Sequence, residues 1–332
     1  NEQMQTISLS REGDRILGVS FNGTGYIWEH GELEQISLKS ETGWIYGIEF
    51  GPSSDKAVII AESGAILWDI SGKDWQMLPH KELRSAKFFA QENKLITGSY
   101  DGSIRVWTLE DSSFVEFEER EAFINDLHIS EQGSHIVTGH SNGRVALWDM
   151  SERKKEWVQG YHNGKSVNHI CFSHDELHIL SSSSNNQAFI WDLQGNPINI
   201  FNHSGVVLSA SFSQDDKFVL TNSSDGTAKY WKVDQDKREA LKTFKMPSTV
   251  TVAALSTDEN FIVTGCKDGI VRFWSLNGRL LFSLPASQGS ISHIQLSPHS
   301  DWLITIGSDG RIHKWNLNPR QLFNPSEIIN RY

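Results

Sequence analysis

Cysteine is scarce in this sequence, and long apolar runs are missing. Only Cys171 and Cys266 occur in 332 residues, both inside apolar, strand-like segments. We interpret them as small buried side chains of a protein in a reducing compartment, in preference to reactive or metal-binding thiols. No apolar stretch approaches the roughly 20 residues of a membrane-spanning helix, and no charged-then-apolar leader begins the chain. We therefore expect a cytoplasmic protein that does not bind a membrane.

Positive charge is also in short supply. The chain carries 30 Lys and Arg against 41 Asp and Glu, which gives a formal net charge of -11. A protein that binds nucleic acid generally needs a basic field, because its affinity comes largely from counterions released from the phosphates. This charge balance argues against a nucleic-acid partner.

Sequence motifs of enzymes and cofactor sites are missing as well. There is no GxxxxGK[ST] phosphate loop, no HExxH or GxSxG motif, and no paired cysteine at metal-binding spacing. We therefore predict no cofactor, no metal and no catalytic residue. His128, His135 and His140 lie close together in the sequence, and we interpret them as separate strand and loop residues in preference to a metal site.

Tryptophan, by contrast, recurs with a regular period. Eight units, separated by 39 to 43 residues, are centred on Trp28, Trp68, Trp107, Trp148, Trp191, Trp231, Trp274 and Trp315. Each unit reads as strand, polar turn, strand, tight turn and strand, followed by a more polar segment suited to a fourth strand. The tight turns include Asp101-Gly102 and Asp225-Gly226, whose residue types adopt positive φ at little cost.

Four-stranded antiparallel units with a period near 40 residues predict the blades of a β-propeller. One such unit cannot bury both of its faces, so neighbours must pack on it and the last must meet the first. We predict an all-β fold with a single domain over residues 1–332. Eight blades are expected, and a ring of seven with one aberrant unit is the alternative.

The Trp-Asp pairs at Trp68-Asp69, Trp148-Asp149 and Trp191-Asp192 make these units resemble WD40 repeats. That resemblance implies a hydrogen-bonded set in each blade, formed by a His before the first strand, a Ser or Thr on the second, an Asp in the turn, and the Trp. Complete sets are His80–Thr97–Asp101–Trp107 and His203–Thr221–Asp225–Trp231, and His162–Ser181–Asn185–Trp191 is nearly complete. Because the sets repeat around the ring whereas an active site occurs once, we assign them a structural role.

The sequence departs from the family pattern in several units. Blades 1, 2, 4, 7 and 8 lack the His, and blade 2 has Val58 and Glu62 in place of the Thr and the Asp. We expect blade 2 to be looser or differently turned. The first inner strand begins near Met4, so the outer strand of blade 8 is expected around Gln321 to Phe323, or from sequence upstream of the chain.

The resemblance also indicates where a partner would bind. In WD40 propellers the usual recognition face carries the connection into the first strand and the turn before the third. The positions that map there on blades 1 to 4 are rich in aromatic residues and Arg, which dominate interface energetics, and we predict that a protein or peptide binds at Phe21, Trp44, Tyr46, Glu82, Arg84, Tyr100, Phe123 and Asn125. The alternative is that these rings fold inward and cap the channel.

Finer similarities point to a biological context. Segments such as WDLQGNPI and WSLNGRLL are similar to the repeats of bacterial WD40 arrays attached to signalling ATPases of the STAND type. Because the chain begins at Asn1, we expect the sensor or scaffold part of a larger multidomain protein. A substrate receptor of a ubiquitin ligase is one alternative, disfavoured by Ser71, Ser151 and Gln194 where a basic residue is common. A hydrolase or lyase with its site in the channel is the other.

Overall fold

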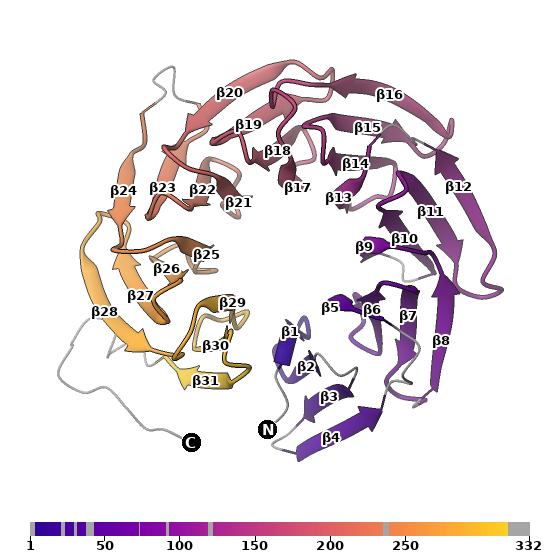
Figure 1. Cartoon of the computed structure of the whole chain (residues 1–332), viewed down its shortest axis with the longest axis horizontal. Helices are drawn as coiled ribbons and strands as arrows, with labels where there is room; N and C mark the ends of the chain where they lie inside the picture. The colour runs from indigo at the N-terminus through magenta and orange to yellow at the C-terminus, as the bar shows by residue number, and fades with distance from the viewer. Residues whose placement is uncertain are drawn as a thin grey trace.

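The protein folds as a closed ring of eight antiparallel β-sheets, the blades of a propeller (Figure 1). The computed structural model describes residues 4–20, 24–29, 32–37, 43–72, 74–90, 93–118, 122–234 and 239–317, with the backbone alone at 32–37 and 118. Seven sheets contain four strands, and the eighth contains three within these residues. The eight-bladed prediction is therefore confirmed over the seven-bladed alternative. The segment Gln321 to Phe323, expected to add the fourth strand of blade 8, lies outside the described residues.

Each blade follows the chain from the channel outwards. Blades 1 to 4 are built from β1 (Met4–Leu9), β2 (Arg15–Ser20), β3 (Thr24–Glu29), β4 (Glu32–Ser37); β5 (Ile45–Phe50), β6 (Lys56–Ala61), β7 (Gly64–Asp69), β8 (Asp74–Pro79); β9 (Leu83–Phe88), β10 (Lys94–Ser99), β11 (Ser103–Thr108), β12 (Phe114–Glu118); and β13 (Ile124–Ile129), β14 (His135–His140), β15 (Val145–Asp149), β16 (Lys154–Gln159). Blades 5 to 8 are built from β17 (Val167–Phe172), β18 (His178–Ser183), β19 (Gln187–Asp192), β20 (Pro197–Asn202); β21 (Val207–Phe212), β22 (Phe218–Ser223), β23 (Thr227–Lys232), β24 (Lys242–Lys245); β25 (Val250–Leu255), β26 (Phe261–Cys266), β27 (Ile270–Ser275), β28 (Leu280–Pro285); and β29 (Ile291–Leu296), β30 (Trp302–Gly307), β31 (Ile312–Asn316). The first strand of every blade lines the channel (Figure 1).

In blades 3, 6, 7 and 8 the turn between the second and third strands is built from an Asp-Gly pair. In blade 6, Asp225 Oδ1 accepts the backbone N–H of Thr227 at 2.9 Å, and Gly226 has a φ of 79°. An Asp side chain that accepts from the backbone two residues ahead closes this kind of turn, and Gly adopts positive φ without the steric cost of a Cβ.

Blade 2 is turned differently, as its departures predict. Val58 pairs with Leu67 nine residues later, whereas Thr97 of blade 3 pairs with Arg105 eight residues later. Ala61 pairs directly with Gly64, so only two residues form the hairpin loop. Strand β6 of this blade is not loosely packed, because five of its six residues are buried.

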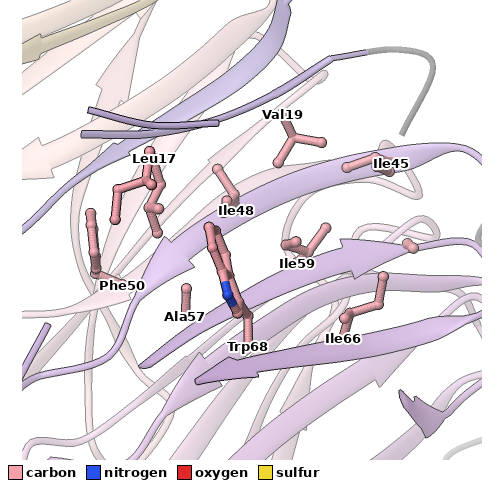
Figure 2. Packing of buried hydrophobic residues seen from close by; sticks show 11 residues of the cluster. Leu17, Val19, Ile45, Ile48, Phe50, Ala57, Ile59, Ile66 and Trp68 are labelled. Carbon is pink, nitrogen blue, oxygen red and sulfur yellow. The ribbon is translucent and has the colours of Figure 1, made fainter. Parts of the chain in front are cut away.

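The hydrophobic core is divided among the boundaries between blades. The described residues form eight apolar clusters, and each cluster joins two neighbouring blades. Figure 2 shows the boundary between blades 1 and 2, where Leu17 and Val19 of one blade meet Ile59 and Trp68 of the next. Six clusters contain one buried Trp of the repeat, from the later of their two blades. Trp315 of blade 8 and Trp28 of blade 1 are partly buried and pack against the other two clusters. The period of tryptophans therefore marks the boundaries that hold the ring together, since a buried indole covers more apolar area than any other side chain.

The ring closes by apolar packing between its last and first blades. Met4, Ile7 and Leu9 of β1 pack against Ile304 and Ile306 of β30. The Met4 backbone N–H also donates to the Gly310 carbonyl at 3.2 Å. The first described strand is thus part of the closing contact.

Residues with left-handed backbone conformation link neighbouring blades on the lower face, which carries the turns between first and second strands. Ser54, Glu176, Asp216, Glu259 and Ser300 all have φ between 54° and 64°. Each accepts a backbone N–H from the preceding blade. Blades 1 and 4 instead have Gly13 and Gly133 there, where a Cβ would meet Pro298 and Phe89 at 2.7 and 2.8 Å.

Candidate functional site

Aromatic side chains and one arginine gather on the upper face, which carries the connections into the first strands. We call Trp44, Tyr46, Arg84, Tyr100 and Phe123 the aromatic–arginine patch. These residues come from blades 2, 3 and 4, whose first strands β5, β9 and β13 lie side by side around the channel (Figure 1). Trp44 is 61% exposed and Phe123 is 53% exposed. Phe21, the predicted member from blade 1, lies outside the described residues.

Arg84 is the centre of this patch. Its guanidinium carbon lies 3.9 Å from the centre of the Tyr46 ring and 3.8 Å from that of the Tyr100 ring. The Tyr100 ring in turn packs on Phe123 with 5.0 Å between ring centres. A cation over the face of an aromatic ring is attracted by the quadrupole of the ring. The four side chains therefore form one continuous stack across three blades.

A chain of backbone hydrogen bonds holds the stack in position. The Glu62 N–H donates to the Trp44 carbonyl at 2.8 Å, Glu82 donates to Glu62 at 2.7 Å, and Tyr100 donates to Glu82 at 3.1 Å. Glu82 has a φ of 55° and an exposed side chain. The upper rims of blades 2 and 3 are therefore joined through their backbones, and Trp44 and Tyr100 are at the two ends of this link.

Asn125, also predicted to bind a partner, is engaged within the ring. Its amide nitrogen donates to the Ser166 hydroxyl at 2.7 Å and to the Val167 carbonyl at 3.0 Å, both in blade 5. Asn168 and Thr251, which hold the same second position of their first strands, donate in the same way to Val207 and Ile291 of the next blades. Tyr46 and Arg84 stand at this position in blades 2 and 3. There the stacked side chains take the place of the polar link between blades.

The predicted His-containing sets come together as buried hydrogen-bond networks. In blade 6, Thr221 Oγ1 lies 2.7 Å from His203 Nε2 and accepts the Trp231 indole N–H at 2.9 Å, while His203 Nδ1 lies 3.1 Å from Asp225 Oδ2. His162, Ser181, Asn185 and Trp191 are joined in the same manner. Burial, with the charge of Lys229 second, lowers the pKa of His203 to about 4, and burial lowers that of His162 to about 4.

Blade 3 contains a variant of the same network. His80 Nδ1 lies 2.7 Å from Thr97 Oγ1, which accepts the Trp107 indole N–H at 2.9 Å. His80 reaches Asp101 only through Ser103, whose hydroxyl lies 2.8 Å from His80 Nε2 and donates to Asp101 at 2.5 Å. Burial, assisted by the charge of Arg105, lowers the pKa of His80 to about 4. The predicted members of the blade 3 set therefore lie next to one another. Among the described residues, His80 is joined to Asp101 only through Ser103, whereas His203 of blade 6 contacts Asp225 directly.

Blade 4 has a histidine in its network that sequence reasoning missed. His140 Nε2 lies 2.9 Å from Thr138 Oγ1, which also accepts the Trp148 indole N–H at 3.1 Å. This histidine comes from the end of the second strand instead of the loop before the first. Blade 4 does lack the His before its first strand, and His140 bonds the Thr of the network in its place. The signal in the sequence was the spacing Thr138-x-His140, because residues two apart on a strand face the same side.

The three neighbouring histidines of blade 4 do not form one site. His140 belongs to the Thr138 network, and His128 packs against Phe172 with 6.0 Å between ring centres. His135 instead has ligand atoms within 4.8 Å of those of Asp149 and Glu156, a spacing that could hold a metal ion. Asp149 Oδ1 already accepts the backbone N–H and the hydroxyl of Ser151, at 2.7 and 2.6 Å.

The channel wall carries a second polar group of residues, on blades 2 to 5. Lys87 Nζ lies 2.5 Å from Glu49 Oε2. Burial lowers the pKa of His128 to about 3 and raises the pKa of the Cys171 thiol to about 12. A thiol with that pKa stays protonated near neutral pH, so Cys171 lacks the thiolate that a nucleophilic cysteine needs. Of the two cysteines predicted to be buried, Cys266 is buried and Cys171 is partly exposed.

No helix among the described residues has the length and apolar character needed to cross a membrane.

Known proteins resemble this chain in sequence repeats and in fold. Over 167 residues, or 48% of this chain, it is 25% identical to mouse cilia- and flagella-associated protein 52, a match that covers 27% of that protein. The chain therefore aligns with well under two thirds of this relative. The computationally designed Ika8 protein superposes with a TM-score of 0.81 at 19% identity over 95% of this chain and 96% of its own. The C-terminal WD40 domain of Sif2 superposes with a TM-score of 0.80 at 16% identity over 92% of this chain and 93% of its own.

The family model for the WD domain, G-beta repeat, matches six segments, namely residues 75–108, 113–149, 155–192, 195–232, 238–275 and 278–316. Each segment begins in or just before the outer strand of one blade and ends with the third strand of the next. The first, for example, contains β8 of blade 2 with β9 to β11 of blade 3. Among the described residues, six tryptophans donate their indole N–H to a Ser or Thr hydroxyl, and each lies in one of these six segments. Together the segments cover more than half of the sequence, and the chain therefore belongs to the WD40 family.

Proposed function

We propose that this propeller is a non-catalytic platform that binds a protein or a peptide on the aromatic–arginine patch. The observation that carries the proposal is the continuous stack from Tyr46 through Arg84 and Tyr100 to Phe123. Phe123 and Trp44, which lies two residues before Tyr46, are both more than half exposed. Large exposed aromatic residues next to an Arg are the composition of interface hot spots. A contiguous patch of this kind is costly on a monomer surface unless a partner covers it.

The polar groups elsewhere in the described residues support a structural role better than a catalytic one. The histidines with the lowest pKa values are held by neighbouring hydroxyl groups or pack against aromatic rings. Lys87 of the channel is already paired with Glu49. The channel-sited hydrolase or lyase is therefore the weaker proposal.

Selection of random peptides on the intact chain tests the platform proposal. We expect selected peptides to bind Trp44→Ala and Tyr100→Ala at least about tenfold more weakly than the parent, which corresponds to roughly 1.4 kcal/mol for each anchor. The matched control is Leu177→Ala, because Leu177 is 59% exposed on the lower face of blade 5. If the selected peptides bind Trp44→Ala and Tyr100→Ala as tightly as the parent, the docking site is elsewhere.

The biological setting that we propose is a sensor or scaffold domain in a larger cytoplasmic protein, for instance one with a STAND-type ATPase domain. The similarity of segments such as WDLQGNPI to bacterial arrays supports it. The full reading frame of the gene tests this proposal, since a frame that encodes the propeller alone overturns it. A ubiquitin-ligase receptor is a weaker proposal, because Ser151 and Gln194 donate their backbone N–H groups to the Asp of the Trp-Asp pair at positions where a basic residue is common.

A further inference from the structure

Arg84 differs from other arginines of the chain in how its charge is satisfied. Arg15, Arg105 and Arg272 each form an ion pair with a carboxylate of the same blade, at 2.9, 2.6 and 2.7 Å. Within the described part of the chain, no hydrogen bond or ion pair from the Arg84 guanidinium accompanies its two aromatic contacts. Its Nε is buried and has no acceptor. A buried N–H without an acceptor costs free energy, and a positive charge without an anion leaves a favourable interaction unused.

The stack restricts the direction from which a ligand can reach this charge. The ring centres of Tyr46 and Tyr100 lie 3.9 and 3.8 Å from the guanidinium carbon, so the two rings already occupy part of the space around the group. Of the guanidinium nitrogens, Nε alone is both buried and unpartnered, so the two Nη atoms are the ones that reach solvent. Two parallel N–H groups in one plane match the two oxygens of a carboxylate.

Nearby acidic groups favour a singly charged ligand over a doubly charged one. The exposed Glu82 lies two residues before Arg84 in the sequence, and the Glu62 carboxylate accepts the Trp44 backbone N–H at 3.3 Å. The whole chain also has a formal net charge of -11. A phosphate group, with a charge near -2 at neutral pH, would be repelled more strongly than a carboxylate by this surrounding.

The aromatic residues on the two flanks indicate where the carboxylate lies within its peptide. Trp44 precedes β5 and Phe123 precedes β13, so they flank blade 3 from its two neighbouring blades. In an extended peptide, side chains two residues apart face the same side and lie roughly 7 Å from each other. An internal acidic side chain with apolar residues at its second neighbours can therefore contact Arg84 and both flanking rings. A C-terminal carboxylate would leave one ring uncovered.

We propose that the aromatic–arginine patch binds an extended segment of a partner protein that places an internal Asp or Glu on Arg84, between two apolar side chains. This inference rests on the proposed platform function and adds the chemistry of the ligand. It assigns charge recognition to Arg84 and apolar contact to Trp44 and Phe123.

The test uses the peptides selected on the intact chain. The selected peptides are expected to share an acidic residue with apolar residues at its second neighbours. One of them, acetylated and amidated at its ends and carrying fluorescein, is compared with its Glu→Gln and Glu→phosphoserine analogues by fluorescence anisotropy. The proteins are the parent, Arg84→Gln, Arg84→Lys, Trp44→Ala and the control Leu177→Ala, each with its melting temperature measured.

We expect Glu→Gln in the peptide and Arg84→Gln in the protein each to weaken binding about tenfold or more, because a charge-assisted hydrogen bond is lost. On Arg84→Gln the peptide change should have no further effect, since the two changes remove the same interaction. Arg84→Lys should recover only part of the affinity, because Lys lacks the planar fork. The phosphoserine peptide should bind more weakly than the Glu peptide.

Three results would overturn the inference. Tighter binding of the phosphoserine peptide would identify a phosphate site in place of a carboxylate site. The selected peptides could depend on Trp44, contain no acidic residue and bind Arg84→Gln as tightly as the parent. That result would support the docking surface and contradict carboxylate recognition by Arg84. If no selected peptide depends on Trp44 or Arg84, the proposed platform site fails together with the inference.

Discussion

The carboxylate of Asp216 in blade 6 lies 2.8 Å from Nδ1 of His174 in blade 5. The same carboxylate accepts the backbone N–H groups of His174 and Asp175 at 3.0 and 2.8 Å. Asp216 therefore holds three donors of the neighbouring blade, although its backbone is left-handed, with a φ of 56°. A non-glycine residue persists in this conformation when surrounding contacts compensate its cost.

We expect Asp216→Ala to lower the free energy of unfolding by about 1 to 3 kcal/mol, because three donors lose their acceptor. Asp216→Asn should cost less, since Asn tolerates the left-handed region and keeps one acceptor oxygen. Glu259→Ala is the matched control, because Glu259 has a φ of 54° and accepts one N–H, from Gln214. Urea denaturation of the three variants measures the effect. Equal losses for Asp216→Ala and Glu259→Ala would contradict the role of the additional contacts.

The His-containing network predicts unequal effects of one substitution in two blades. Thr221 and Thr264 are both fully buried, and both accept a Trp indole N–H. Thr221 also bonds His203, whereas blade 7 has no histidine in its network. We expect Thr221→Val to destabilise the protein by about 1 kcal/mol or more beyond Thr264→Val, because it leaves a second buried polar group without a partner. Thermal unfolding of the two variants tests this difference, and indistinguishable midpoints would argue against it.

The buried histidines predict a loss of stability in mild acid. The pKa values of His80, His162 and His203 are lowered by burial from 6.5 to about 4. Between these values the unfolded chain binds protons that the folded chain does not, so the free energy of unfolding falls as the pH drops from about 6.5 towards 4. Aspartates with lowered pKa values change the free energy of unfolding mainly at still lower pH.

The measurement is urea denaturation of the parent and of His203→Gln at pH 7 and pH 5. The parent should lose stability between the two, and His203→Gln should lose less, by on the order of 1 kcal/mol, because one of the groups that takes up a proton on unfolding is gone. A parent protein that is equally stable at both pH values would show that these histidines are not buried in their neutral form.

The closing boundary of the ring is sensitive to a single methyl group at Gly13. Gly13 has a φ of 75°, and an added Cβ would lie 2.7 Å from Pro298 Cδ in blade 8. Gly164 has a similar φ of 70° but open space around it, so Gly164→Ala measures the backbone cost alone, about 1 kcal/mol. We expect Gly13→Ala to cost clearly more, through displacement of blade 8 from blade 1. Differential scanning calorimetry compares the two, and the same melting temperature for both would mean that the boundary adapts freely.

Much of the fold could be predicted because its signals are local and repeated. The tryptophan period identified the eight blades, and the Asp-Gly turns placed their hairpins, since both depend on residues a few positions apart. Which side chains link the blades could not be read in the same way. Asn125 had the same sequence signal as Tyr46 and Arg84, but its short amide reaches the next blade and donates to Val167. Whether a residue at this position links two blades or faces a partner depends on the distance between the blades, and the sequence does not contain that distance.

The candidate site was predicted in composition and not in arrangement. Sequence reasoning placed Arg84 and Tyr100 on one face, because both occupy positions that point to the upper rim. That Arg84 contacts both Tyr46 and Tyr100 depends on how closely blades 2 and 3 approach each other, which the sequence does not contain. His140 was missed because the family pattern has its His in the loop before the first strand. In blade 4 the His that bonds the Thr comes from the second strand.

The offset between sequence repeat and blade affects how such a ring can change in size. Each repeat supplies the outermost strand of one sheet and the three inner strands of the next. Every sheet between two consecutive repeats therefore contains strands from both of them. Duplication or loss of one full repeat therefore leaves every such sheet with its four strands and changes the number of blades by one. Duplication or loss of a segment that is not a whole number of repeats would instead leave one sheet with too few or too many strands.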